Sequence, residues 1–176
     1  MGDPAFNWEI VIGASSAIIA LSALLFSICS FRKQQRRADV YAKAAVKPFL
    51  SIKSKKYIDL KSIRLCNDGV GPAIIKKATF QYKGGKPTNR IVELFSLGNI
   101  VYDSFTNIPE NKVLAASESI TLVELSLKNL MNQGLSEGES IKMLEKWQTQ
   151  KSGIIAQIEY EDIYNNKMAE LNETLN

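Results

Sequence analysis

The stretch IVIGASSAIIALSALLFSICSF, residues 10–31, decides the fold of this chain because it holds 22 consecutive residues without a charge. A helix of that length spans about 33 Å, enough to cross a hydrocarbon core of about 30 Å. Lipid offers no hydrogen-bond partner to free backbone groups, so such a segment has to be helical. The sequence therefore predicts one transmembrane α-helix at residues 10–31, preceded by a short extracytoplasmic N-terminus, residues 1–9.

Charges beside this stretch predict its direction in the membrane. Arg32, Lys33, Arg36 and Arg37 follow it, and no lysine or arginine precedes it. The positive-inside rule places the basic side in the cytoplasm, where these residues also meet anionic lipid head groups. An acidic N-terminus and a long apolar run argue against a cleaved signal peptide. We therefore expect a single-pass protein of the inner, cytoplasmic membrane, with its N-terminus outside and its C-terminal domain in the cytoplasm.

Small side chains recur every three or four residues along the apolar stretch, so on a helix they form one stripe. They are Gly13, Ser16, Ala20, Ala23, Ser27 and Ser30. Small residues let two helices approach closely in lipid, which predicts a helix–helix interface and a homo-oligomer. The alternative is that such residues are simply common in membrane anchors and that the serines bond back to their own helix.

The residues after the apolar stretch predict a basic juxtamembrane helix, residues 32–47. They are rich in Ala, Gln, Arg and Lys, which favour helix. Pro48 disfavours helical conformation at Lys47, so the helix should end near that residue. The basic run could also contact nucleic acid. Membrane anchoring already accounts for it, so a nucleic-acid partner is disfavoured.

Residues 48–176 show the two-residue alternation of short strands separated by turns. Strands are predicted at residues 49–52, 57–60, 63–66, 73–82, 113–114, 119–125 and 153–160, with a last segment at 164–170 pairing with the final strand. Helices are predicted at 88–97, 127–133 and 141–147, the last opened by a capping box at residues 136–139. This pattern is typical of a mainly-β domain, and we expect an immunoglobulin-like β-sandwich with two or three inserted helices.

A dense turn cluster, NDGVGPA, follows one predicted strand at residues 67–73. We interpret Asn67, Gly69, Gly71 and Pro72 as a structural turn, because these residue types serve turn geometry. A phosphate-binding loop would need the G-x-x-x-x-G-K-[ST] pattern, which is missing here.

The turn N-x-G-x-G-P-A, together with the later Y-x-D at residues 160–162, resembles small bacterial single-pass membrane proteins with a cytoplasmic immunoglobulin-like β-sandwich. The resemblance covers about residues 48–165. It implies a fold and a membrane topology, and it carries no agreed activity. The predicted helices at residues 126–148 depart from the simplest form of that pattern.

Two residue types that often carry catalysis or bind metals, histidine and cysteine, contribute little in this chain. There is no histidine, and the two cysteines, Cys29 and Cys66, form no C-x-x-C pair. The commonest base near neutral pH is therefore absent, as are the cysteine patterns of zinc sites and disulfide frameworks. An acidic cluster is conceivable at Asp103, Glu159, Glu161 and Asp162, without the spacing of a calcium loop. We expect no enzyme, no catalytic, cofactor-binding or metal-binding residues, and no cofactor.

These observations favour a membrane-anchored interaction or scaffold module that presents its domain to an unidentified protein partner. One alternative is an oligomerising membrane effector that perturbs the bilayer in response to a cytoplasmic sensor, such as an antiphage sensor. Another is a membrane-tethered nucleic-acid binder, which predicts salt-dependent binding by residues 48–176.

Overall fold

The structure is a computed structural model of the whole chain. It describes the backbone of residues 8–175 and the side chains of residues 12–175. The predicted segment at residues 1–9 lies almost wholly outside the described residues. Contacts divide the chain into two units, Met1–Ala44 and Ala45–Asn176.

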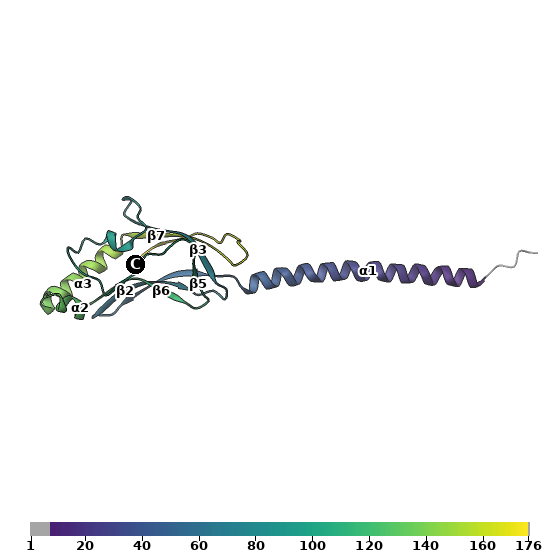
Figure 1. Cartoon of the computed structure of the whole chain (residues 1–176), viewed down its shortest axis with the longest axis horizontal. Helices are drawn as coiled ribbons and strands as arrows, with labels where there is room; N and C mark the ends of the chain where they lie inside the picture. Colours follow the sequence, from purple (N-terminus) through teal and green to yellow (C-terminus); the bar gives the residue numbers. More distant parts are fainter. Residues whose placement is uncertain (1–7, 176) are drawn as a thin grey trace, which may run out of the picture. The chain divides into compact units, whose positions relative to one another are not determined.

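The first unit is built from one helix, α1, Trp8–Ala45, which runs 38 residues without a break (Figure 1). At 1.5 Å per residue this corresponds to about 57 Å. The uncharged stretch and the basic residues after it share this helix, because the second part is rich in good helix formers. The helix ends just before Lys47, which Pro48 keeps out of helical conformation.

The described residues of the second unit form two four-stranded antiparallel sheets. One sheet has the order β1-β2-β6-β4, with strands Leu50–Lys56, Leu60–Asn67, Ser119–Ser126 and Ser104–Phe105. The other has the order β5-β3-β7-β8, with strands Lys112–Leu114, Ala73–Tyr82, Ile154–Glu161 and Leu171–Thr174. The prediction of a long apolar helix followed by a mainly-β domain is confirmed.

Both sheets contribute to one hydrophobic core, and Figure 1 shows them as two layers. Ile63 and Leu65 of β2 are fully buried, as are Ile75 of β3 and Ile158 of β7. The two residues of β2 are two positions apart, because alternate side chains of a strand point to the same face. The alternation read from the sequence therefore marks the side of each sheet that faces the core.

Two helices, α2 Leu127–Asn132 and α3 Glu137–Lys151, lie between β6 and β7 in the chain. The predicted capping box is confirmed: Ser136 Oγ accepts from the Glu139 amide, and the Glu139 carboxylate accepts from the Ser136 amide. Trp147 of α3 is fully buried and stacks on Phe95, with ring centroids 5.1 Å apart. This stacking joins α3 to the core.

The helix predicted at residues 88–97 is wrong. Only a short 3-10 helix, η1 Ile91–Leu94, forms there, and no side chain caps its first turn. Thr88 instead exchanges two backbone hydrogen bonds with Phe80 of β3, at 2.7 and 2.9 Å. This pairing keeps the chain before η1 extended. Phe95 follows η1 in an extended conformation and is buried in the core.

The strand predicted at residues 57–60 is also wrong, because β1 ends at Lys56 and β2 begins at Leu60. The intervening chain is the hairpin loop, and Ile58 is 84% exposed there. The prediction that residues 164–170 pair with the preceding strand fails except for one bridge, Glu161 to Lys167. The pairing partner of β7 is β8, further along the chain. Strand β4 has only two residues, and its alternation was too short to be read from the sequence.

Candidate functional site

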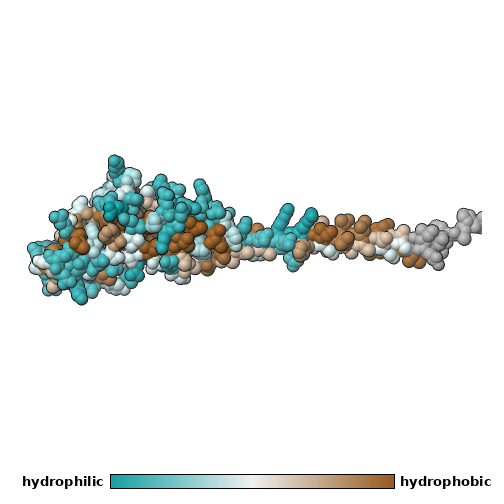
Figure 2. Space-filling view, viewed as in Figure 1, coloured by the Kyte–Doolittle hydropathy of each residue, from teal (hydrophilic) through white to brown (hydrophobic). Residues whose placement is uncertain are grey.

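One helix in the described part of the chain, α1, is long and apolar enough to cross a membrane. Its described side chains are all exposed, including Ile12, Leu21 and Phe26, so no protein core covers them. Figure 2 shows a continuous hydrophobic surface along this part of the helix, followed by a hydrophilic one. Lipid is the environment in which such a surface is stable.

The small residues predicted to form a stripe all lie within α1 with exposed side chains. The hydroxyl of Ser16 donates to the carbonyl of Ile12, and that of Ser27 donates to the carbonyl of Ala23, both at 2.8 Å. A Cβ added at Gly13 would meet no neighbouring atom. The serines at positions 16 and 27 therefore bond back to their own helix, and their hydroxyl donors are already used.

The basic residues predicted to contact lipid head groups follow directly in the same helix. Their side chains are exposed; they are Arg32, Lys33, Arg36 and Arg37. Since the helix does not break between Phe31 and Arg32, the change from apolar to basic surface is sharp. A sharp change of this kind suits the boundary between hydrocarbon and head groups.

The turn at residues 67–73 lies at one end of the second unit, which we call the base, and Asn67 is its centre. Asn67 is fully buried. Its Oδ1 accepts from the amides of Gly69 at 3.0 Å and Phe49 at 3.2 Å. Its Nδ2 donates to the carbonyls of Gly71 at 2.8 Å and Leu114 at 3.0 Å. One side chain thus joins the chain before β1, the end of β2 and strand β5.

The two glycines of this turn are required by close packing of backbone on backbone. A Cβ at Gly69 would overlap the backbone of Pro48 and Phe49, and one at Gly71 would overlap the backbone of Val46. Pro72 follows without a donor and leads into β3. The polar groups of Asn67 are used internally, which is the arrangement of a structural turn.

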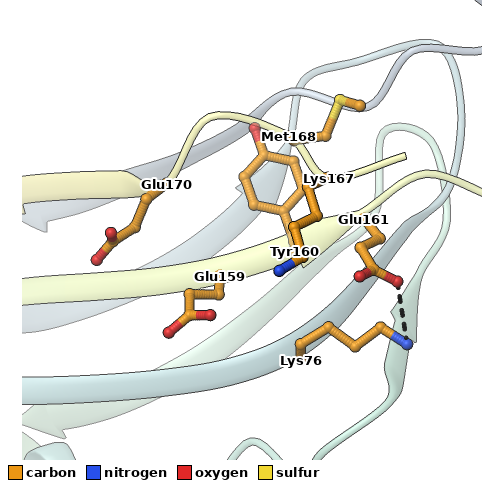
Figure 3. Close-up of a pocket in the computed structure, with 7 residues that line it drawn as sticks. All are labelled: Lys76, Glu159, Tyr160, Glu161, Lys167, Met168 and Glu170. Atoms are coloured by element: carbon orange, nitrogen blue, oxygen red, sulfur yellow. Dashed lines mark ion pairs between the residues drawn. The ribbon is translucent and has the colours of Figure 1, made fainter. Parts of the chain in front are cut away.

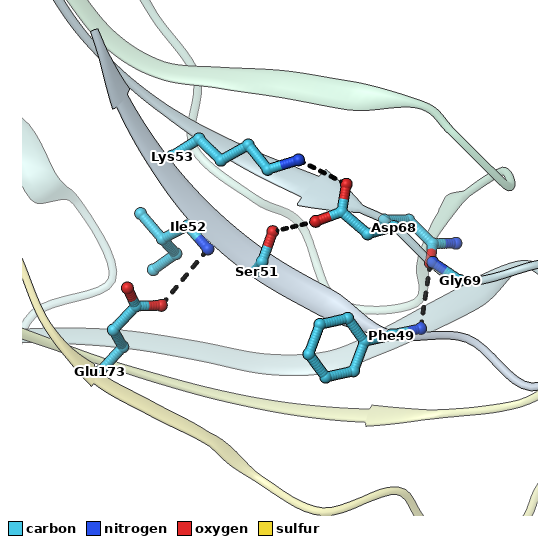
Figure 4. A network of polar contacts seen from close by, with 8 residues as sticks. Phe49, Ser51, Ile52, Lys53, Asp68, Gly69 and Glu173 are labelled. Atoms are coloured by element: carbon cyan, nitrogen blue, oxygen red, sulfur yellow. Dashed lines mark hydrogen bonds and ion pairs between the residues drawn. The ribbon is translucent and has the colours of Figure 1, made fainter.

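A surface network next to the turn is shown in Figure 4. The carboxylate of Asp68 accepts from Ser51 Oγ at 2.6 Å and pairs with Lys53 Nζ at 2.6 Å. The hydrogen bond from Lys53, and then that from Ser51, lower the pKa of Asp68. Burial raises the pKa of the neighbouring Cys66 thiol, which keeps it protonated and weakly nucleophilic. The network orders the surface of β1 and supplies no activated nucleophile.

Two adjacent cavities also lie at the base, and neither is predicted by a sequence pattern. The first, of about 260 Å³, is lined by Lys76, Glu159, Tyr160, Glu161, Lys167, Met168 and Glu170 (Figure 3). The second, of about 320 Å³, is lined by Lys47, Pro48, Phe49, Leu50, Tyr160, Met168, Ala169, Glu170 and Leu171. They share Tyr160, Met168 and Glu170, so one surface offers a charged hollow beside a more apolar one.

Ion pairs neutralise part of the charge that lines the first cavity. Lys76 Nζ lies 3.2 Å from Glu161 Oε2 and donates to Asn111 Oδ1 at 3.1 Å. Glu159 lies 3.9 Å from Lys77. Such a lining suits polar and charged groups of a partner at its rim. Spacing along the sequence could not reveal it, because its residues come from β3, β7 and the β7–β8 connection.

Of the four acidic residues singled out in the sequence, Glu159 and Glu161 line the first cavity, whereas Asp103 and Asp162 do not. The carboxylate of Asp103 accepts from the Ser126 amide and hydroxyl at 2.6 and 2.8 Å. Asp162 is buried, and its Oδ1 accepts from the amides of Tyr164 and Asn166, which turns the chain after β7. Within residues 12–175, no group of three or more Cys, Asp or Glu side chains could hold a metal ion.

Comparison with known proteins adds no assignment: no protein-family model and no curated protein matches this chain.

Proposed function

We propose that this protein is a membrane-anchored interaction module, in which α1 fixes the location and the second unit binds a protein partner. The observation that carries the proposal is the continuity of α1. A surface suited to lipid is followed, without a break in the helix, by a basic surface and then by a compact β-rich unit. A single anchor of this kind sets where a domain works and leaves the domain free to bind.

The direction of the anchor is part of the proposal. Arg32, Lys33, Arg36 and Arg37 directly follow the uncharged stretch, and the positive-inside rule then places the second unit in the cytoplasm. The proposed location is the inner, cytoplasmic membrane, with the N-terminus outside. A reporter that is active only in the cytoplasm, fused after Asn176, is expected to be active, and activity of a periplasm-specific reporter in its place would overturn this direction.

We also propose that the two sheets form an immunoglobulin-like sandwich. The orders β1-β2-β6-β4 and β5-β3-β7-β8 support it, because each sheet mixes strands distant in sequence, as Greek-key connections do. The shared core between the sheets adds further support.

The base cavities are the proposed partner site. They join a charged hollow to an apolar one, and Glu170 lines both and is itself exposed. An interface needs an apolar centre for affinity and polar groups at the rim for specificity, and both are present here.

Site-specific photo-crosslinking in cells tests this site. A photoreactive residue at position 170 of the full chain is expected to give one discrete adduct with another protein. The matched control carries the same residue at position 86, where Lys86 is exposed on a loop that lines neither cavity. Adducts of equal yield and size from both positions would contradict a partner site at the base.

A second candidate function is an oligomerising membrane effector. The observation that favours it is the stripe of small residues on α1, whose serines at positions 16 and 27 bond to their own helix. The double substitution A20L/A23L is expected to reduce the oligomer seen by crosslinking in membranes. Forced clustering of the wild-type protein would then depolarise the membrane; a normal potential under clustering would remove this candidate.

A further inference from the structure

The hairpin that joins β1 to β2 ends in a loop that is mostly basic and apolar, which we call the basic tip: Lys55, Lys56, Tyr57, Ile58 and Lys61, with one acidic residue, Asp59, between Ile58 and Lys61. Tyr57 is 59% exposed and Ile58 is 84% exposed. Lys61 Nζ donates to the carbonyl of Tyr57 at 2.7 Å, which holds the loop closed. The fold thus presents an aliphatic and an aromatic side chain to the surroundings between lysines.

Positive charge at the basic tip is concentrated by the strand register. Lys56 lies directly opposite Lys61 in the β1–β2 pair, where like charges destabilise a hairpin. Lys151 Nζ donates to Ser54 Oγ at 2.9 Å, so a third ammonium group lies close to this pair. Among the described ion pairs, none includes Lys55, Lys56 or Lys61. An external anionic surface would relieve this repulsion.

The basic tip lies at the opposite end of the second unit from the base. Strand β1 begins near the base at Leu50 and reaches the tip after seven residues, which is about 23 Å. The tip is therefore separate from the Asn67 turn and from both base cavities. It is also separate in sequence from the basic residues that follow the uncharged stretch of α1.

We propose that the basic tip binds the surface of an anionic phospholipid bilayer. Lysine ammonium groups attract anionic head groups, and an exposed aliphatic side chain enters the boundary between head groups and hydrocarbon. A tyrosine is favoured at that boundary because its ring is amphipathic. A nucleic acid would use the lysines but would gain little from Ile58, so the apolar apex of the loop favours the bilayer. This contact is independent of the proposed partner site.

Flotation of the full chain tests the proposal. The protein is first placed in nanodiscs of phosphatidylcholine, so that α1 is already in lipid. The nanodiscs are then mixed with vesicles of phosphatidylcholine alone or with about one third phosphatidylglycerol. We expect binding only to the anionic vesicles, and loss of that binding at high salt because screening shortens the reach of the charges.

Variants assign the binding to the tip. Each lysine near an anionic surface strengthens binding about fivefold, so K55Q/K56Q/K61Q is expected to weaken it on the order of 100-fold. Ile58→Ser is expected to weaken it about tenfold, since a buried aliphatic side chain contributes at least that much. The matched controls are K77Q/K112Q, which removes two lysines of the other sheet, and Val70→Ser, which replaces an exposed valine at the base.

Several outcomes would overturn the proposal. One is anionic-vesicle binding by K55Q/K56Q/K61Q equal to wild type, which would assign the charge effect to the basic part of α1. Another is an equal loss in the matched controls. A third is a lack of vesicle binding together with salt-sensitive binding of a single-stranded oligonucleotide that needs the same lysines. Thermal melts of all variants show whether each is folded, so a loss of binding can be read as a loss of contact.

Discussion

Helix α1 and the β-rich unit differ in what fixes the role of each residue. Every described side chain of α1 is exposed, and four of its serines, at positions 15, 16, 22 and 27, bond to carbonyls of the same helix. In the β-rich unit, residues from both sheets share one core, and Asn67 alone connects three segments. Local chemistry is therefore enough to define the helix, whereas the domain depends on contacts between distant residues.

The largest expected effect tests this difference between the helix and the domain. Trp147→Ala removes a fully buried ring stacked on Phe95 and is expected to destabilise the β-rich unit by about 3–5 kcal/mol. The matched change in α1 is Leu21→Ala, at a side chain that is 61% exposed and should leave the unfolding of the domain unchanged. Pulse proteolysis in urea on the full chain in detergent measures both. Equal effects would show that the two regions do not differ as described.

The next expected effect concerns the turn at residues 67–73. Asn67→Ala leaves the buried partners of that side chain without hydrogen bonds and is expected to cost about 2–3 kcal/mol of unfolding free energy. Asn172→Ala, at an exposed position of β8, should change little and serves as the control. If both variants had the same midpoint of chemical denaturation, the hydrogen bonds of Asn67 would not contribute to the stability of the domain.

A smaller effect concerns a contact within one helix of the domain. Ser136→Ala removes the cap of α3 and is expected to lower stability by about 1 kcal/mol. Ser119→Ala, at an exposed serine, is the control and should leave the thermal midpoint where it is. If both variants had the same thermal midpoint, the capping box would contribute nothing measurable to stability.

The last expected effect is a dependence on pH. Burial, and then the charges of Lys56 and Lys61, lower the pKa of Lys151 to about 8 from its usual 10.5. The unfolded chain therefore holds more protons between these two values, so stability should rise as the pH rises from about 8 to about 10.5. Lys151→Met should remove this rise. A wild-type profile that falls over that range, relative to the variant, would show that the charged form is the one the fold prefers.

Sequence patterns predicted the parts of the fold that depend on neighbours in the chain. The uncharged stretch, the alternation in β2, β3, β6 and β7, and the capping box at Ser136 all follow local rules, and the structure contains them. The order of strands in each sheet could not be predicted, because alternation shows which face is buried and not which strand lies alongside. Local spacing also predicts a helix that includes Thr88, because the pattern cannot show that Thr88 pairs with the distant Phe80.

The candidate sites also differ in whether local sequence is enough to predict them. The anchor surface of α1 can be read directly from the sequence, since it needs only composition and helical spacing. The base cavities cannot, because Lys76 and Glu170 line one hollow from elements far apart in the chain. The basic tip lies between these cases: its lysines are close in sequence, but only the register shows that Lys56 and Lys61 face each other.

The bonds of Asn67 have a mechanical consequence for a domain attached to an anchor. A pull on α1 would reach the domain between Val46 and Phe49, where Lys47 and Phe49 are already held by backbone bonds to Val70 and Asp68. Asn67 bonds to the Phe49 amide and to the carbonyl of Leu114, and so spreads the load at once over β1, β2 and β5. Tension would therefore have to break several hydrogen bonds together before β1 could separate from β2. Bonds that share a load resist a higher force than bonds that break one after another.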